Sequence, residues 1–87
     1  MSYHLRILPS ARRDMRKLPR GMLVRIDRAV LALADDPRPS GVKALRGGAD
    51  LYRIRVGDYR IIYTVEDRIV TVCVVRVRHR RDAYRIG

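Results

Sequence analysis

A two-residue turn at Gly57 and Asp58 is the feature that most constrains how this chain can fold. It separates two runs, residues 51–56 and 59–66, in which apolar and polar side chains alternate. Alternation with a period of two is typical of β-strands, and a glycine-containing pair between two such runs predicts a tight antiparallel hairpin. The turn therefore sets the register of both strands.

This register sorts the side chains of the hairpin onto two faces, with Arg55 directly across from Arg60. One face is apolar and is expected to lie under the rest of the fold; it carries Tyr52, Ile54, Val56, Tyr59, Ile61, Tyr63 and Val65. The other, named here the arginine face, carries Arg53, Arg55 and Arg60 beside Ile62 and Thr64. Arginines placed across from each other repel. We therefore expect an anion site in which phosphate oxygens accept their hydrogen bonds, the alternative being a plain exposed basic surface.

The first third of the chain predicts one strand and two helices. Residues 3–8 alternate enough to form a short strand, and Ser10 after the Pro9 break is expected to cap a helix. Apolar residues then recur with helical spacing as far as residue 36, interrupted at Pro19, because a residue that precedes proline avoids the helical region. Residues 10–36 therefore predict a helical hairpin.

The remaining segments complete an α+β fold. Residues 37–50 are rich in proline and glycine and predict a loop, anchored on the core by Val42 and Leu45. A turn at residues 67–68 is expected to precede a third antiparallel strand at 69–77, which is rich in β-branched residues. We expect an N-terminal strand and a helical hairpin packed on a mainly antiparallel β-sheet.

Length and charge limit the classes of function. The 87 residues suffice for a single domain, 1–87, with a thin core. Twenty Lys and Arg against nine Asp and Glu give a net charge of +11, and only Lys17 and Lys43 are lysines. This excess points to a polyanionic partner. No apolar run reaches the roughly 18 residues that span a membrane. The N-terminus lacks the apolar segment of a signal peptide, so we expect a cytoplasmic protein without a membrane partner.

Metals and cofactors are not expected. Cys73, His4 and His79 are too few and too scattered to form a metal-ligand pattern. Cys73 is the only cysteine, so it cannot form an internal disulfide, and its β-type surroundings predict a buried strand position.

A second group of basic residues lies at the end of the third strand: Arg76, Arg78, His79, Arg80 and Arg81. One register of this strand puts Arg76 and Arg78 on the arginine face, and the other turns them toward the helices. Burying unpaired arginines is very costly, so we favour the first register. Arg80 and Arg81 lie beyond the strand, where alternation does not place them.

Four segments, taken in order, resemble the RelE branch of the RelE/ParE toxin superfamily. They are LRG at residues 45–47, LYRIRV at 51–56, DYRIIY at 58–63 and HRRDAY at 79–84. The resemblance implies a small RelE-like domain and a cognate acidic antitoxin as partner. It also implies a metal-independent endoribonuclease that cuts mRNA in the ribosomal A site. In that reaction the 2′-hydroxyl attacks the adjacent phosphate and the 5′-oxygen leaves.

The same resemblance assigns site residues. Arg53 and Arg55 stand where the family has a basic pair that binds and activates RNA, and Arg60 matches an arginine near the scissile phosphate. Arg80 matches the arginine at the leaving side, and Tyr84 a tyrosine that orients the base. The expected catalytic residues are thus Arg55, Arg60, Arg80 and Tyr84. The expected RNA- or phosphate-binding residues are Arg53, Arg55, Arg76, Arg78, His79 and Arg81.

One departure leaves the general base open. Some members of the family have lysines where this chain has Arg53 and Arg55, and arginine does not give up its proton in proteins. His79 has a suitable side chain for a base, although a simple phosphate contact is an equal reading. Without a base, the protein would cut slowly or stall the ribosome by binding.

Two other functions fit the composition. A ParE-like toxin shares the fold and inhibits DNA gyrase by binding it, without RNA cleavage. A plain RNA-binding module would need aromatic side chains on its binding face for base stacking. The tyrosines of this chain fall mostly on the expected core face, which disfavours the plain module.

Overall fold

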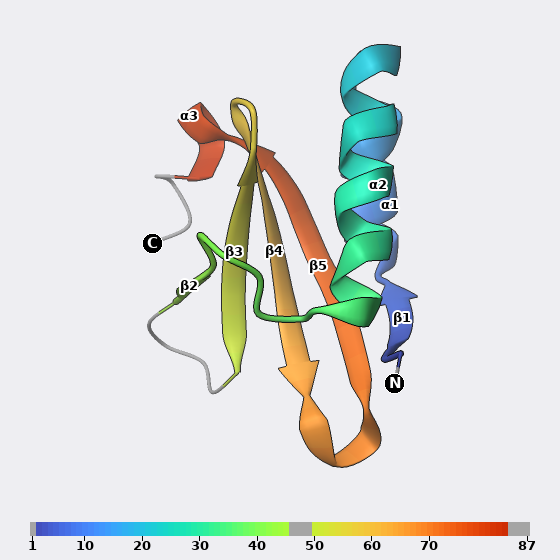
Figure 1. Cartoon of the computed structure of the whole chain (residues 1–87). Coiled ribbons are helices and arrows are strands. Elements are labelled where there is room, and N and C mark those ends of the chain that lie inside the picture. Colours follow the sequence, from blue (N-terminus) through green and yellow to red (C-terminus); the bar gives the residue numbers. More distant parts are fainter. Residues whose placement is uncertain (1, 46–49, 84–87) are drawn as a thin grey trace.

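The computed structural model describes residues 2–45 and 50–83, which form a β-sheet with two helices packed on one side and a short third helix after the last strand (Figure 1). The described strands are β1 (His4–Ile7), β2 (Lys43–Ala44), β3 (Leu51–Val56), β4 (Tyr59–Glu66) and β5 (Thr71–His79). The helices are α1 (Pro9–Arg16), α2 (Arg20–Asp35) and α3 (Arg80–Ala83), with a 3₁₀ turn, η1, at Asp67–Ile69. The sheet order is β1-β5-β4-β3-β2, in which β1 is parallel to β5 and the other pairs are antiparallel. The predicted α+β fold is confirmed.

The hairpin register predicted from the sequence is also confirmed. Val56 pairs with Tyr59 and Arg55 with Arg60. Gly57 has a φ of 59°, in the left-handed region that glycine adopts at little cost. A Cβ atom at this position would also lie 3.1 Å from the terminal methyl carbon of Met22 on α2. Both the turn and the close approach of α2 therefore favour glycine here.

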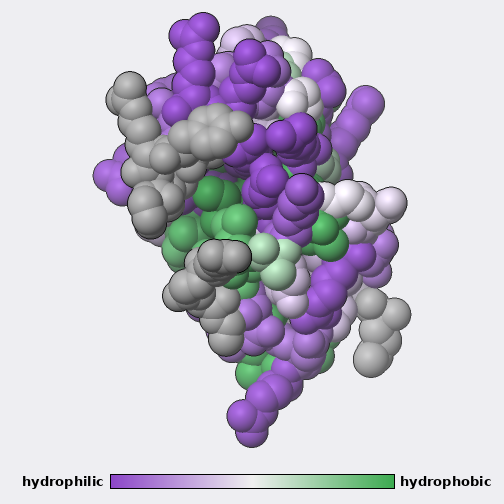
Figure 2. All heavy atoms as spheres, turned by 90° about the vertical axis from the view of Figure 1, so that its left-hand side faces the viewer, coloured by the Kyte–Doolittle hydropathy of each residue, from purple (hydrophilic) through white to green (hydrophobic). Residues whose placement is uncertain are grey.

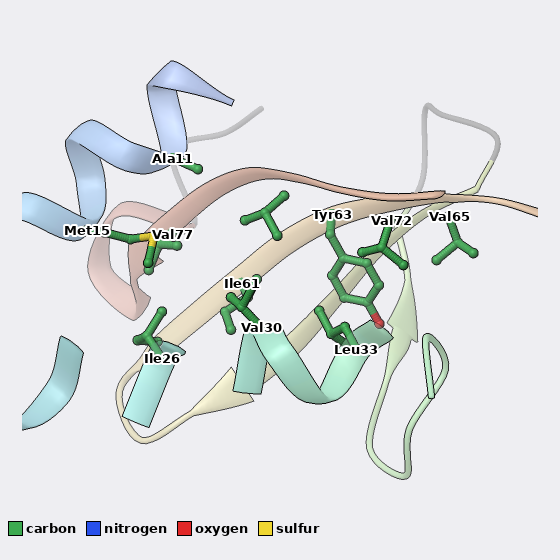
Figure 3. Close-up of a cluster of buried hydrophobic side chains, with 11 residues drawn as sticks. Ala11, Met15, Ile26, Val30, Leu33, Ile61, Tyr63, Val65, Val72 and Val77 are labelled. Atoms are coloured by element: carbon green, nitrogen blue, oxygen red, sulfur yellow. The ribbon is translucent and has the colours of Figure 1, made fainter. Parts of the chain in front are cut away.

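The apolar face of the hairpin lies under α1 and α2, as expected. Figure 3 shows the core between these helices and the sheet. The helices contribute the buried side chains Ala11, Met15, Ile26, Val30 and Leu33, and the sheet contributes Ile61, Tyr63, Val65, Val72, Val74 and Val77. None of the helices among the described residues is both long and apolar enough to cross a membrane.

Tyr63 fastens the segment that follows α2 to this core. It is the largest fully buried side chain among the described residues. Burial raises the pKa of its hydroxyl to about 12, so the group stays protonated at neutral pH. It donates a hydrogen bond of 2.7 Å to the carbonyl oxygen of Pro37.

We expect Tyr63→Phe to lower the free energy of unfolding by about 1–2 kcal/mol, because the Pro37 carbonyl loses its donor inside the core. Urea denaturation measures the change. Tyr52→Phe is the matched control, since the Tyr52 hydroxyl accepts a hydrogen bond from Arg38 in an exposed setting. Equal effects of the two substitutions would contradict the argument.

The predicted cap of the first helix is wrong. The helix begins at Pro9, and Leu8 at the cap position makes no side-chain hydrogen bond to it. Proline suits the first helical position because its ring already fixes φ near the helical value. Ser10 thus falls inside the helix, and its hydroxyl donates to the Val75 carbonyl oxygen of β5 at 2.8 Å.

Two connections also differ from the prediction. The segment between β4 and β5 spans residues 67–70, longer than a turn at 67–68, and Val70 has a left-handed φ of 51°. The predicted loop at residues 37–50 contains the short strand β2, which pairs with β3. Val42 packs against the core as expected. A two-residue edge strand has too few positions for alternation to reveal it.

Candidate nucleic-acid interface

The arginine face lies on the side of the sheet that α1 and α2 leave uncovered. Figure 2 views the molecule from this side and shows mostly hydrophilic side chains around a small apolar area. Arg60 on β4 pairs with Arg55 on β3 and with Arg78 on β5, which places three arginines in a row across three strands. Arg60 is 8% exposed. Neighbouring like charges in such a row repel one another, and an anion that accepts their hydrogen bonds would offset this repulsion.

A β-bulge brings Arg78 into this row. Val74 pairs with Tyr63 and Arg76 with Ile62, so Val75 is an extra residue in β5. Strict alternation from Val74 would instead have turned Arg76 and Arg78 toward the helices. The bulge shifts the alternation by one residue, which buries Val77 in the core and places Arg78 beside Arg60. Among the described residues, the buried Nε of Arg78 has no hydrogen-bond acceptor.

Arg76 is held by a carboxylate that the sequence reading did not connect to it. Its Nε and Nη2 donate to Asp14 of α1 at 2.8 and 3.1 Å, and the Val77 backbone N–H donates to the same carboxylate at 3.0 Å. Helix α1 thus covers the edge of β5 beyond the point where β1 ends. Arg76 pairs with Ile62 in the sheet and so belongs to the arginine face, but its guanidinium forms the ion pair with Asp14.

The carboxyl of Asp14 makes the stability of the fold sensitive to acid. Burial raises its pKa, but hydrogen bonds from Arg76 and from the Val77 N–H outweigh this and hold the pKa below its ordinary 3.8. The ionised form therefore stabilises the fold. This contribution is fully present above pH 3.8 and is lost as the pH falls through the lower pKa of the folded state.

We therefore expect the free energy of unfolding to fall when the pH is lowered below about 4, because the unfolded state then binds more protons. Asp14→Asn should remove part of this slope, and urea denaturation between about pH 6 and pH 2.5 measures it. A remaining slope is expected from Asp67, whose pKa is lowered by hydrogen bonds from Arg38 and Tyr3. An identical pH slope in the wild type and the Asn variant would contradict the prediction.

The structure brings three of the expected catalytic residues into one hollow. Arg55, Arg60 and Arg80 line a hollow of about 110 Å³ at the end of the β3–β4 hairpin, together with Gly57, Asp58 and Tyr59. The Arg80 backbone N–H donates to the Asp58 carbonyl oxygen at 2.8 Å, which fixes the start of α3 beside the hairpin turn (Figure 1). Alternation could not place Arg80, and this long-range hydrogen bond does.

A second hollow, of about 260 Å³, lies next to the first and is lined by Gly41, Lys43, Arg53 and Arg55. Lys43 reaches this position because β2 pairs it directly with Arg53. The sequence reading did not include Lys43 in the site, because it lies in a segment predicted to be a loop. The only sequence signal that could have identified Lys43 is its positive charge in the loop that precedes the strand of Arg53 and Arg55.

Two of the other expected site residues, His79 and Arg81, do not line either hollow. His79 pairs with Tyr59, on the helix-covered side, and its ring stacks edge-on against Tyr59 with centroids 5.1 Å apart. Its Nδ1 accepts a hydrogen bond of 3.3 Å from the Arg81 backbone N–H. His79 therefore does not share the hollow of Arg60. Arg81 is exposed on α3. Tyr84 lies outside the described residues.

The chain matches known proteins over nearly its whole length. Residues 5–84 match a family described as the ParE toxin of type II toxin-antitoxin system, parDE. The chain belongs to the RelE/ParE superfamily of type II toxins. The toxin RelG of Mycobacterium tuberculosis is 37% identical over 86 residues, covering 98% of this chain and 99% of the relative. The toxin RelE of the same organism is 31% identical over 87 residues, covering 98% and 89%.

Solved structures agree with this assignment. The toxin-antitoxin complex RelBE2 from Mycobacterium tuberculosis matches with a TM-score of 0.80 and 33% identity, over 91% of this chain and 99% of that one. The isolated Escherichia coli RelE toxin matches with a TM-score of 0.78 and 27% identity, over 99% and 100%. The RelE-like toxin predicted from the four ordered segments is confirmed.

Proposed function

We propose that this RelE-like toxin is a metal-independent endoribonuclease that cleaves mRNA in the ribosomal A site. The observation that carries the proposal is one hollow lined by Arg55, Arg60 and Arg80. These three arginines come from three different elements, β3, β4 and α3, and meet only through the fold. Three guanidiniums around one small volume suit a phosphate whose negative charge grows during the reaction. The RelE names of the relatives favour RNA as the substrate.

The chemistry requires charge stabilisation and proton transfer. The RNA 2′-hydroxyl attacks the adjacent phosphorus and loses its proton, while the 5′-oxygen leaves and gains one, giving a 2′,3′-cyclic phosphate and a 5′-hydroxyl. We propose that Arg60 holds a non-bridging phosphate oxygen and that Arg80 stabilises the leaving oxygen, while Arg55, which lines the same hollow, adds a third positive charge. Tyr84 is proposed, from the family resemblance, to orient the base.

Among the described residues of the hollow, the three guanidiniums offer electrostatic stabilisation and not a general base. Arginine remains protonated in proteins, so none of the three guanidiniums accepts the proton of the 2′-hydroxyl. His79 lies on the other side of the sheet. Most of the rate enhancement is thus assigned to positioned charges that meet the phosphorane, a contribution that exceeds what the same charges provide in water.

We also propose a cognate acidic antitoxin as a partner. Two related toxins, from Mycobacterium tuberculosis and Pyrococcus horikoshii, were solved as complexes with their antitoxins. The net charge of +11 favours rapid, salt-sensitive association with an acidic protein. Co-purification with the product of the neighbouring reading frame tests this proposal. Recovery of a freely expressed toxin, harmless to the cell without any partner, would contradict it.

The decisive experiment maps mRNA cleavage on programmed ribosomes by primer extension, with the same mRNA free of ribosomes as control. We expect cuts at the A-site codon and products that end in a cyclic phosphate. The same preparation is tested for inhibition of DNA supercoiling by gyrase. Inhibition of supercoiling without RNA cleavage would overturn the proposal in favour of a gyrase inhibitor.

A further inference from the structure

The two hollows of the arginine face adjoin, because Arg55 lines both. Among the described residues, the larger one is lined by three cationic side chains, those of Lys43, Arg53 and Arg55, and by no carboxylate. Lys43 and Arg53 are direct partners across β2 and β3, so their side chains leave the sheet on the same side. This cluster is thus as suited to an anion as the proposed catalytic hollow.

The spacing of the two hollows fits one nucleic-acid strand. Arg53 and Arg55 are two residues apart on β3, which corresponds to about 7 Å along a strand. Successive phosphates of a single RNA strand are separated by a comparable distance. An isolated anion would need only one hollow, whereas a strand that places its scissile phosphate between Arg55 and Arg60 must place a neighbouring phosphate close by.

We propose that Lys43, together with Arg53 and Arg55, binds the phosphate adjacent to the scissile one and so sets the position of the RNA strand. The inference rests on the proposed function and extends it by one nucleotide. Arg53 and Arg55 offer planar forks, while Lys43 adds a compact ammonium on a flexible stem, reaching in from the edge of the sheet. Gly41, with a φ of 88°, allows the chain to turn into β2 and present Lys43 there.

The test measures RNA binding without cleavage. A short single-stranded RNA with 2′-O-methyl riboses cannot react, because the attacking hydroxyl is blocked, and fluorescence anisotropy gives its affinity over a range of salt concentrations. We expect Lys43→Gln to weaken binding about fivefold at low salt. It should also reduce the slope of log affinity against log salt by about 0.7, the value for one phosphate contact to a single strand.

Lys17→Gln is the matched control, since it removes the only other lysine, an exposed residue on the segment after α1. It should bind RNA as the wild type does. Thermal melting of both variants verifies that the fold is retained.

Replacing single phosphates by neutral methylphosphonates locates the contact. In each variant, one phosphate should be found whose neutralisation no longer lowers the RNA affinity, because the side chain that contacts it is missing. The phosphate found with Lys43→Gln should lie one nucleotide from the phosphate found with Arg60→Ala. If Lys43→Gln binds like Lys17→Gln while Arg60→Ala loses affinity, the inference fails and the proposed function stands. A variant that loses affinity only for the antitoxin also overturns the inference. A wild type without any affinity for the free RNA overturns the inference, whereas cleavage on programmed ribosomes decides the proposed function separately.

Discussion

Replacing Arg60 by alanine is expected to slow the cleavage of A-site mRNA by about 100- to 1,000-fold, or about 2.7–4 kcal/mol of transition-state stabilisation. Arg60 lies in the middle of the arginine row, between Arg55 and Arg78, and its side chain is largely buried. A charge fixed in a water-poor position interacts strongly with a developing phosphorane and needs little reorganisation. Single-turnover cleavage on programmed ribosomes measures the effect.

The stability of Arg60→Ala should change far less than its activity. The substitution relieves repulsion from Arg55 and Arg78, worth a few tenths of a kcal/mol to about 1 kcal/mol. It also removes the packing of the buried aliphatic stem, which acts in the opposite direction. We therefore expect a melting temperature close to that of the wild type, measured by circular dichroism.

Two further variants make the Arg60 result specific. Arg60→Lys should recover only part of the rate, because one ammonium replaces a two-pronged donor. Arg12→Ala removes an exposed arginine from α1, away from the arginine face, and should cut as the wild type does. A normally folded Arg60→Ala that cleaves at the wild-type rate would show that the arginine face is not catalytic. A large loss of melting temperature would instead give Arg60 a structural role.

The largest effect on stability is expected for Asp14→Ala, a loss of about 2–3 kcal/mol in the free energy of unfolding. The substitution removes the acceptor of three hydrogen bonds and leaves the part-buried N–H of Val77 without it. It also leaves Arg76 without its counter-charge close to other arginines. For a domain of this size the melting temperature should fall by roughly 10–20 °C.

Partial substitutions separate the two functions of Asp14. Asp14→Asn retains an oxygen that can accept from the Val77 N–H, and Arg76→Met removes only the ion pair, so both should cost less than Asp14→Ala. Asp27→Ala, at an exposed position on α2, is the control for loss of a surface carboxylate. If Asp14→Ala melts like Asp27→Ala, the contact between α1 and β5 does not stabilise the fold as argued.

Local sequence signals determined the hairpin and its faces. The turn at Gly57 and Asp58 fixes which residues of β3 and β4 are partners, because only two residues separate them. Alternation then places Arg55 and Arg60 on the side away from the helices. The helical spacing of apolar residues similarly located α1 and α2. In each of these cases the information lies within a few residues along the chain.

Tertiary structure decided how the site is completed. The cost of burying arginine already favoured the arginine face for Arg78, but the bulge at Val75 that achieves this has no local signature. The bulge coincides with the covering of the β5 edge by Asp14, which is 62 residues from Arg76. Lys43 enters the arginine face through an edge strand of only two residues. These features depend on contacts between distant segments. Such contacts form and stabilise the fold only when the helices and the sheet pack together, so the pattern of neighbouring residues does not encode them.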